Sequence, residues 1–134
     1  MNRNDIPRQM DDLLGRLFPL NRSLTGSGNR KTLEILSEIV PLEIHEYPSG
    51  TEVFDWTIPP EWDLQEGWID DADGRRLIDV SDSNLHVMGY SDPIRKRMSF
   101  TELSLNLHTT SSDEDAIPYR TSYYERTWGF CVSK

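Results

Sequence analysis

The segment FPLNRSLTGSGNR, residues 18–30, separates two stretches of helical periodicity and decides how the front of the chain folds. Pro19 ends the first helical pattern, because a proline inside a helix removes a hydrogen bond and clashes with the preceding turn. Ser27 is a candidate N-cap of the second pattern, since a serine hydroxyl can accept a hydrogen bond from the first helical turn. The segment therefore predicts a short joint between two helices.

On both sides of this joint, apolar residues recur with the period of an amphipathic helix. The two stripes consist of Met10, Leu13, Leu14, Leu17 and Phe18 over residues 8–18, and of Leu33, Leu36, Ile39 and Val40 over residues 29–40. Two short helices with one stripe each cannot close a core. We expect these stripes to pack on the rest of the chain or on a structure that the chain does not contain.

After Pro41 the apolar period changes from 3.6 to 2, which predicts strands. The expected strands are LEIHEY (42–47), TEVFDW (51–56), NLHVMGY (84–90) and YYERTWGFCV (123–132), with a hairpin in WIDDADGRRLIDV (68–80) that turns at Asp73-Gly74. Ser99 and Glu102 form a capping-box pattern that predicts a short helix with Leu103 and Leu107 on one face. The fold class expected is α+β: a two-helix head, residues 1–41, followed by a β-rich, mostly antiparallel domain, residues 42–134.

Composition excludes several classes of function. The 134 residues carry a formal net charge of -9, which repels the phosphate backbone, so we expect no nucleic-acid partner. No apolar run approaches the roughly 20 residues of a membrane span, and the first residues lack the apolar core of a signal peptide. The single cysteine, Cys131, excludes an internal disulfide, and its apolar neighbours favour a buried thiol. These features predict a cytoplasmic protein without a membrane partner.

No metal site or catalytic motif is predicted within these residues. The segment DDADG is reminiscent of a calcium loop, but with Gly74 at the sixth position the first and twelfth would be Ile69 and Val80, where carboxylates are required. The three histidines have no H-x3-H or HExxH spacing and no companion cysteine pair. Neither a G-x-S-x-G motif nor a Walker-type glycine loop is present.

Arg22 distinguishes a plain turn from the edge of a site. A guanidinium beside the positive end of a helix is repelled unless a carboxylate meets it. That carboxylate would belong to this chain, which we favour, or to a substrate. The backbone N–H groups of GSG, residues 26–28, could also hold an anion, with a plain N-terminal cap as the more common alternative.

Two aromatic clusters, FDWTIPPEW (54–62) and TSYYERTWGF (121–130), could form a ligand surface or an interdomain contact. Asp55 lies between two large aromatics and needs a partner if it is buried. The candidate residues for an interdomain or ligand surface are Asp55, Trp56, Tyr123, Tyr124 and Trp128.

Four ordered blocks carry a resemblance: LFPLNRSLTGSGNRKTLEIL, PLEIHEYPSGTEVFDWTIPPEW, NLHVMGYSDPI and DAIPYRTSYYERTWGFC. Together they resemble the N-terminal part of a bacterial family of aminopeptidase-like zinc exopeptidases that carry an inserted domain of unknown function. In similar proteins the helical head packs on an α/β exopeptidase core, the β-rich segment is the insert, and the zinc ligands follow the block that ends here.

The resemblance implies an N-terminal fragment of a zinc-dependent aminopeptidase, a hydrolase that needs zinc in its full-length form but holds none in this chain. The insert would cap or gate the cleft, and the partners would be the remaining exopeptidase core and a peptide or small-molecule substrate. Arg22, Ser23 and Thr25 would lie on the substrate side of the complete site. The exposed stripes also predict a homo-oligomer if nothing covers them.

An alternative function is that of a non-catalytic module that binds a protein or a carbohydrate through its surface aromatics. A stable globular domain that serves only in assembly is a third possibility. Binding that disappears with Trp56→Ala, while the fold is kept, would support the second interpretation.

Overall fold

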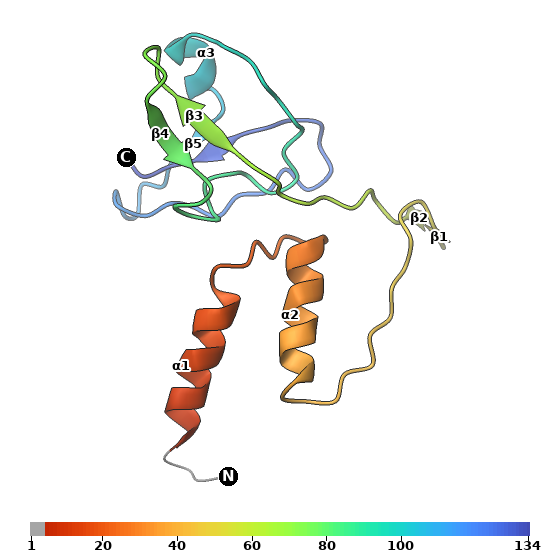
Figure 1. Ribbon diagram of the computed structural model, residues 1–134. Coiled ribbons are helices and arrows are strands. Elements are labelled where there is room, and N and C mark those ends of the chain that lie inside the picture. Colours follow the sequence, from red (N-terminus) through yellow and green to blue (C-terminus); the bar gives the residue numbers. More distant parts are fainter. Residues whose placement is uncertain (1–4) are drawn as a thin grey trace. The chain divides into compact units, whose positions relative to one another are not determined.

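The computed structural model describes residues 5–134, which divide into two compact units, residues 5–61 and Trp62–Lys134 (Figure 1). Helices and small sheets are mixed along the chain, in agreement with the predicted combination of helices and mostly antiparallel strands. The expected division at residues 41 and 42 concerns the architecture of the longer family members and stays a prediction. None of the helices in the described part of the chain is long and apolar enough to cross a membrane.

Helix α1 (Ile6–Leu17) confirms the first predicted helix, with Asp5 at its N-cap and Pro7 in its first turn. Its apolar stripe is largely uncovered. Met10, Leu14 and Phe18 are 58%, 62% and 78% exposed, whereas Leu17 is buried. The helix therefore presents an apolar face that no described residue covers.

Helix α2 (Ser27–Ser37) confirms the second predicted helix but begins earlier than the periodicity indicated. The predicted N-cap at Ser27 is wrong, because Gly26 holds that position with a φ of 95° and Ser27 is the first helical residue. A positive φ is accessible to glycine without the steric cost that a Cβ atom would bring. Near its end, Glu38 receives two hydrogen bonds of 2.7 Å from Arg16 of α1, which joins the two helices.

Two strand predictions in the first unit are wrong. Instead of the single strand expected over residues 51–56, residues 52–57 form a tight hairpin of β1 (Glu52–Val53) and β2 (Trp56–Thr57), with Phe54 at a φ of 54° in the turn. Residues 42–47 belong to no strand of the described structure, because their backbone has no neighbouring strand to pair with there.

The second unit contains the predicted hairpin, formed by the antiparallel strands β3 (Trp68–Asp70) and β4 (Arg76–Asp79). Its turn places Gly74 at a φ of 82°, and the Asp71 carboxylate accepts hydrogen bonds from the N–H groups of Asp73 and Arg75. An aspartate that bonds to the backbone two residues on is typical of such turns. Local turn chemistry thus predicted this element correctly.

Helix α3 (Phe100–Ser104) has the predicted capping box between Ser99 and Glu102. It is shorter than expected, and Leu107 belongs instead to β5 (Leu107–His108), which pairs in parallel with β6 (Phe130–Cys131). The two longer strands predicted over residues 84–90 and 123–132 are reduced to β6 and two isolated bridges.

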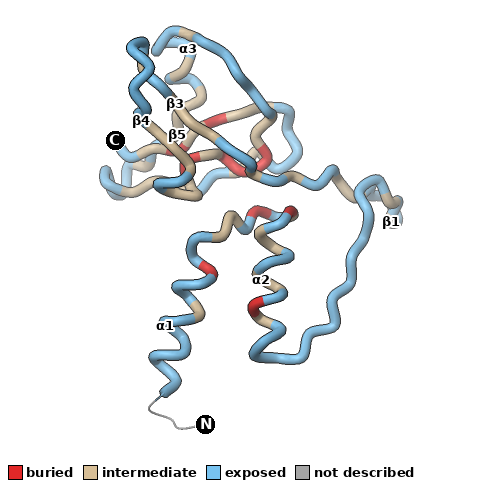
Figure 2. The backbone as a smooth tube through the Cα atoms, in the orientation of Figure 1, coloured by how far each residue is buried: buried red, intermediate tan, exposed pale blue. Residues whose placement is uncertain are grey.

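The core of the second unit is small and lies where these segments meet (Figure 2). Met88 and Tyr90 are buried, and Cys131 is fully buried, which confirms the prediction for this thiol. His86 is also buried, and its Nδ1 lies 2.9 Å from the carbonyl oxygen of Cys131. Burial raises the pKa of the Cys131 thiol, which favours its protonated form.

Candidate functional site

The joint between α1 and α2 is a compact loop that folds back on the first turn of α2. A Cβ atom at Gly28 would lie 1.7 Å from the carbonyl oxygen of Asn21, so the loop backbone contacts the helix where only glycine fits. Asn29 donates a hydrogen bond of 2.5 Å from Nδ2 to the carbonyl oxygen of Ser23. The spacing G-x-G therefore encodes a turn and a close approach of two backbone segments.

Ser23 is the most informative of the predicted site residues. Its relative exposure is 6%, and its Oγ is buried with no hydrogen-bond partner among the described residues. A buried hydroxyl without a partner costs free energy, and such groups are uncommon in folded proteins. The hydroxyl is thus available for a group that the described residues do not supply.

Arg22 and Thr25 flank this hydroxyl in sequence. Arg22 is exposed and makes no ion pair with any of residues 5–134, so the carboxylate of this chain that we expected to face it is absent there. Thr25 is half-buried. The joint combines an available guanidinium, a buried hydroxyl and the N-terminal end of an 11-residue helix.

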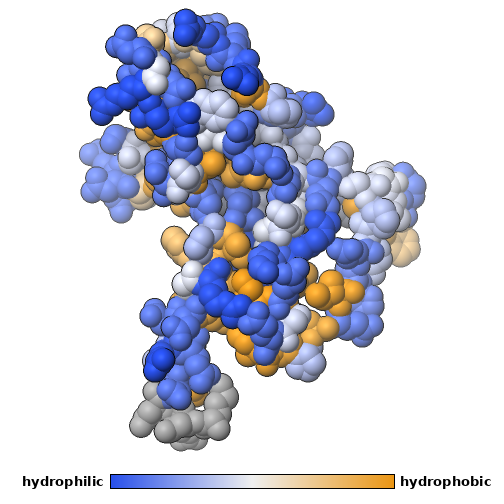
Figure 3. Space-filling model, in the orientation of Figure 1, coloured by the Kyte–Doolittle hydropathy of each residue, from blue (hydrophilic) through white to orange (hydrophobic). Residues whose placement is uncertain are grey.

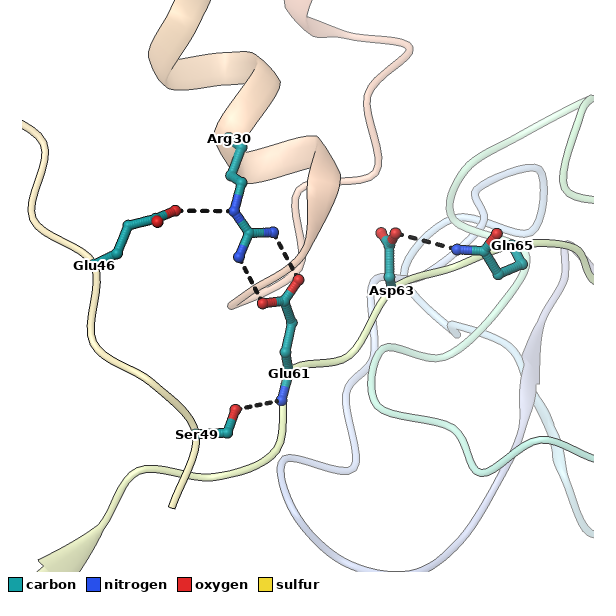
Figure 4. A network of polar contacts seen from close by, with 6 residues as sticks. All are labelled: Arg30, Glu46, Ser49, Glu61, Asp63 and Gln65. Carbon is teal, nitrogen blue, oxygen red and sulfur yellow. Dashed lines mark hydrogen bonds and ion pairs between the residues drawn. The ribbon is translucent and has the colours of Figure 1, made fainter. Parts of the chain in front are cut away.

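A second polar cluster in the same unit was not foreseen from the sequence (Figure 4). Arg30 of α2 donates two hydrogen bonds of 2.7 and 2.6 Å to the carboxylate of Glu61 and one of 3.0 Å to Glu46. Ser49 accepts a hydrogen bond from the backbone N–H of Glu61. These contacts connect α2 to residues that lie 16 and 31 positions later in the chain. No local sequence pattern indicates pairs that are this far apart.

The guanidinium of Arg30 lowers the pKa of the Glu61 carboxyl, mainly through the side-chain hydrogen bonds, and the pKa of Arg30 is raised correspondingly. A bidentate arginine–carboxylate pair has a defined geometry. The cluster Arg30, Glu46 and Glu61 therefore ties two points of the segment 41–61 to α2. We call this cluster the clamp.

Asp55 and Trp56 lie in the β1–β2 hairpin of the first unit and are both exposed, Trp56 by 52%. Because Asp55 is exposed, it does not need the partner that burial would require. Phe54, which sequence analysis did not single out, is 102% exposed at a positive φ. A phenylalanine in that conformation is uncommon, and only the backbone geometry reveals it.

Tyr123, Tyr124 and Trp128 lie in the second unit. Tyr123 is 61% exposed at a φ of 54°, and Tyr124 is 46% exposed. Tyr124 packs edge-on against the buried Tyr90, which stacks in turn on Trp62. Burial is the main cause that raises the pKa of Tyr124. The structure thus divides the five predicted aromatic-surface residues between two separately described units.

Within residues 5–134 no group of three or more histidine, cysteine, aspartate or glutamate side chains could hold a metal ion. The pKa of His108 is lowered, first by burial and then by the charge of Arg120, which favours its neutral form. On the first unit, Figure 3 shows apolar side chains gathered around α2.

Comparison with known proteins adds three findings. The family model described as "Domain of unknown function (DUF2172)" matches residues 61–134. A "Putative polysaccharide biosynthesis protein with aminopeptidase-like domain" of Clostridium acetobutylicum is 45% identical over 133 residues, which are 99% of this chain and 31% of that protein. The crystal structure of a "putative peptidase" from Clostridium acetobutylicum has a TM-score of 0.90 and 46% identity, over 96% of this chain and 31% of that one.

The chain therefore spans about a third of the length of both relatives. Two elements of the predicted resemblance are confirmed: a domain of unknown function, and a relative whose name contains the words aminopeptidase-like.

Proposed function

Because the chain belongs to the DUF2172 family, we propose that it forms the N-terminal third of a bacterial, cytoplasmic, zinc-dependent aminopeptidase and is not catalytic alone. The observation that carries this proposal is its 45% identity to a protein with an aminopeptidase-like domain, of which it covers 31%. The remaining two-thirds would supply the exopeptidase core, and the β-rich insert would cap or gate the cleft. We refer to this longer polypeptide as the full-length protein.

Zinc bound in that core would polarise the scissile carbonyl and lower the pKa of a water molecule. The metal ligands would come from outside this chain, since residues 5–134 contain no suitable group of side chains. The contribution of this chain would be to bind and orient the substrate.

Arg22, Ser23 and Thr25 are the residues proposed for that task. Among residues 5–134, Arg22 makes no ion pair and the buried hydroxyl of Ser23 has no hydrogen-bond partner, and both residues lie in the joint that precedes α2. A peptide or a related small molecule carries carboxylate and carbonyl oxygens that match these donors. The same arrangement explains why the joint is built from polar residues although it lies between two amphipathic helices.

Arg22→Ala in the full-length protein is expected to raise KM for a peptide substrate by about tenfold or more, since a hydrogen bond to a charged group contributes about 1.5–3 kcal/mol. Ser23→Ala is expected to raise KM with little loss of stability, because it removes an unsatisfied buried hydroxyl.

Arg8→Ala is a matched control, an exposed arginine on α1. Steady-state kinetics with thermal unfolding checks both; unchanged kinetics with lowered stability would show that the joint is structural.

The second candidate function is a non-catalytic module that binds a protein or a carbohydrate. It is favoured by the exposed side chains of Trp56, Tyr123 and Tyr124, and by the words "polysaccharide biosynthesis" in the name of the relative. Binding of the 134-residue chain to a glycan array, lost in Trp56→Ala at unchanged far-UV circular dichroism, would support it. Absence of binding to glycans and proteins would eliminate it.

A further inference from the structure

Residues 42–47, with the sequence LEIHEY, have the alternation of a strand without the pairing of one. All six residues are exposed, including Leu42 at 40% and Ile44 at 48%. Within the described structure none of their backbone N–H or C=O groups bonds to another backbone group. Both edges of the segment are therefore open.

One side-chain contact fits an extended backbone at the centre of this segment. Nε2 of His45 lies 3.2 Å from Oε1 of Glu43, so these two side chains project from the same side of the backbone. Because successive side chains of an extended chain alternate, Leu42 and Ile44 project from the opposite side. One face carries Glu43, His45 and Tyr47, and the other carries the exposed Leu42 and Ile44, followed by Glu46.

The segment is also held in place at its far end. Arg30 of α2 contacts Glu46, and it contacts Glu61 through two further hydrogen bonds. An extended stretch whose backbone groups are unpaired lacks the hydrogen bonds that normally offset the conformational entropy lost on ordering. A partner strand would supply them.

We propose that residues 42–47 add as a strand to the edge of a sheet formed by the remaining two-thirds of the full-length protein. An open backbone edge matches another strand by main-chain hydrogen bonds, as in β-augmentation. Leu42 and Ile44, which are exposed in this chain, would then lie on a covered face of that sheet. This inference rests on the proposal that the chain is part of a longer protein.

The same polypeptide is a better occupant than a second copy. This chain covers 31% of each relative, so the relatives contain about twice as many further residues that could supply a sheet. A strand in the same polypeptide also pairs at a high effective concentration. Two copies that paired through residues 42–47 would form an isolated two-stranded ribbon, which is marginally stable in water.

Hydrogen exchange of the backbone amides of residues 42–47 tests the inference. It is measured in the 134-residue chain and in the full-length protein, with the remaining two-thirds of the Clostridium relative appended if the natural frame ends at Lys134. We expect exchange near the unprotected rate in the short chain and at least about 100-fold slower exchange in the full-length protein. Equally fast exchange in both would overturn the inference.

Ile44→Pro provides the matching variant, because proline lacks the N–H that a ladder needs. In the full-length protein this substitution is expected to remove protection from the neighbouring amides. The control Ser111→Pro, in an exposed loop, is expected to leave the protection of residues 42–47 unchanged. Protection that appears in the short chain only at high concentration would assign the edge to a second copy and overturn the inference. A full-length protein that is protected but inactive would instead contradict the proposed peptidase function alone.

Discussion

Gly28 determines the geometry of the joint at the scale of one residue. The carbonyl oxygen of Asn21 lies so close to Gly28 that a methyl group at position 28 would force the backbone of Asn21 to move. From the sequence alone, the segment GSG could form a helix cap, a turn or an anion-binding site. The close approach itself could not be foreseen, because it depends on how the preceding loop folds back.

Gly28→Ala is expected to destabilise the first unit by about 2 kcal/mol, since overpacking against fixed atoms costs about 1–3 kcal/mol. Gly15→Ala is the matched control in α1, where an added Cβ meets nothing within 4 Å. That control should be stabilising by about 0.5–1 kcal/mol, because alanine is a better helix former than glycine. Denaturant unfolding followed by helical circular dichroism measures both; equal effects of the two substitutions would contradict the packing of Asn21 on Gly28.

Ser23 and Arg22 show what single-residue reasoning achieves and where it ends. The charge argument favoured a carboxylate of this chain as the partner of Arg22, which residues 5–134 do not provide, and a partner from a substrate stays a prediction. The burial of Ser23 has no signature in the sequence. It follows from the path of the loop.

At the scale of elements, local signals predicted local structure well. Both long helices, the capping box of α3 and the β3–β4 hairpin follow from patterns within a few residues. The strand predictions failed where pairing decides the outcome. Residues 51–56 fold on themselves at Phe54, and residues 42–47 have no strand to pair with among the described residues.

The clamp around Arg30 is an element-scale contact with a pH dependence. The pKa of Glu61 is lowered from 4.5, so its contribution to stability is fully present above that value and is lost as the pH falls through the folded-state pKa. We expect Glu61→Gln to reduce the loss of stability of the first unit below pH 4.5, and Glu66→Gln, an exposed residue of the second unit, to leave it unchanged. Unfolding free energies measured by helical circular dichroism between pH 7 and pH 3 test this; identical curves for Glu61→Gln and the parent would contradict the clamp.

At the scale of the whole molecule, a cover for the apolar stripes of the helical head stays a prediction. Met10, Leu14 and Phe18 remain uncovered by the described residues. Residues 42–47 add a second exposed feature, a stretch of backbone that pairs with no strand among the described residues. Neither feature requires the chain to act alone, and both are consistent with relatives about three times as long.

The central claim is that these residues serve a zinc-dependent aminopeptidase, and the most direct test is the activity of the full-length protein. Release of N-terminal amino acids from a set of short peptides is measured after metal removal and again after zinc is restored, with the 134-residue chain in parallel. We predict hydrolysis by the full-length protein that disappears without zinc and returns with it, and none by the 134-residue chain. A folded, zinc-loaded full-length protein that cleaves none of these peptides would contradict the claim.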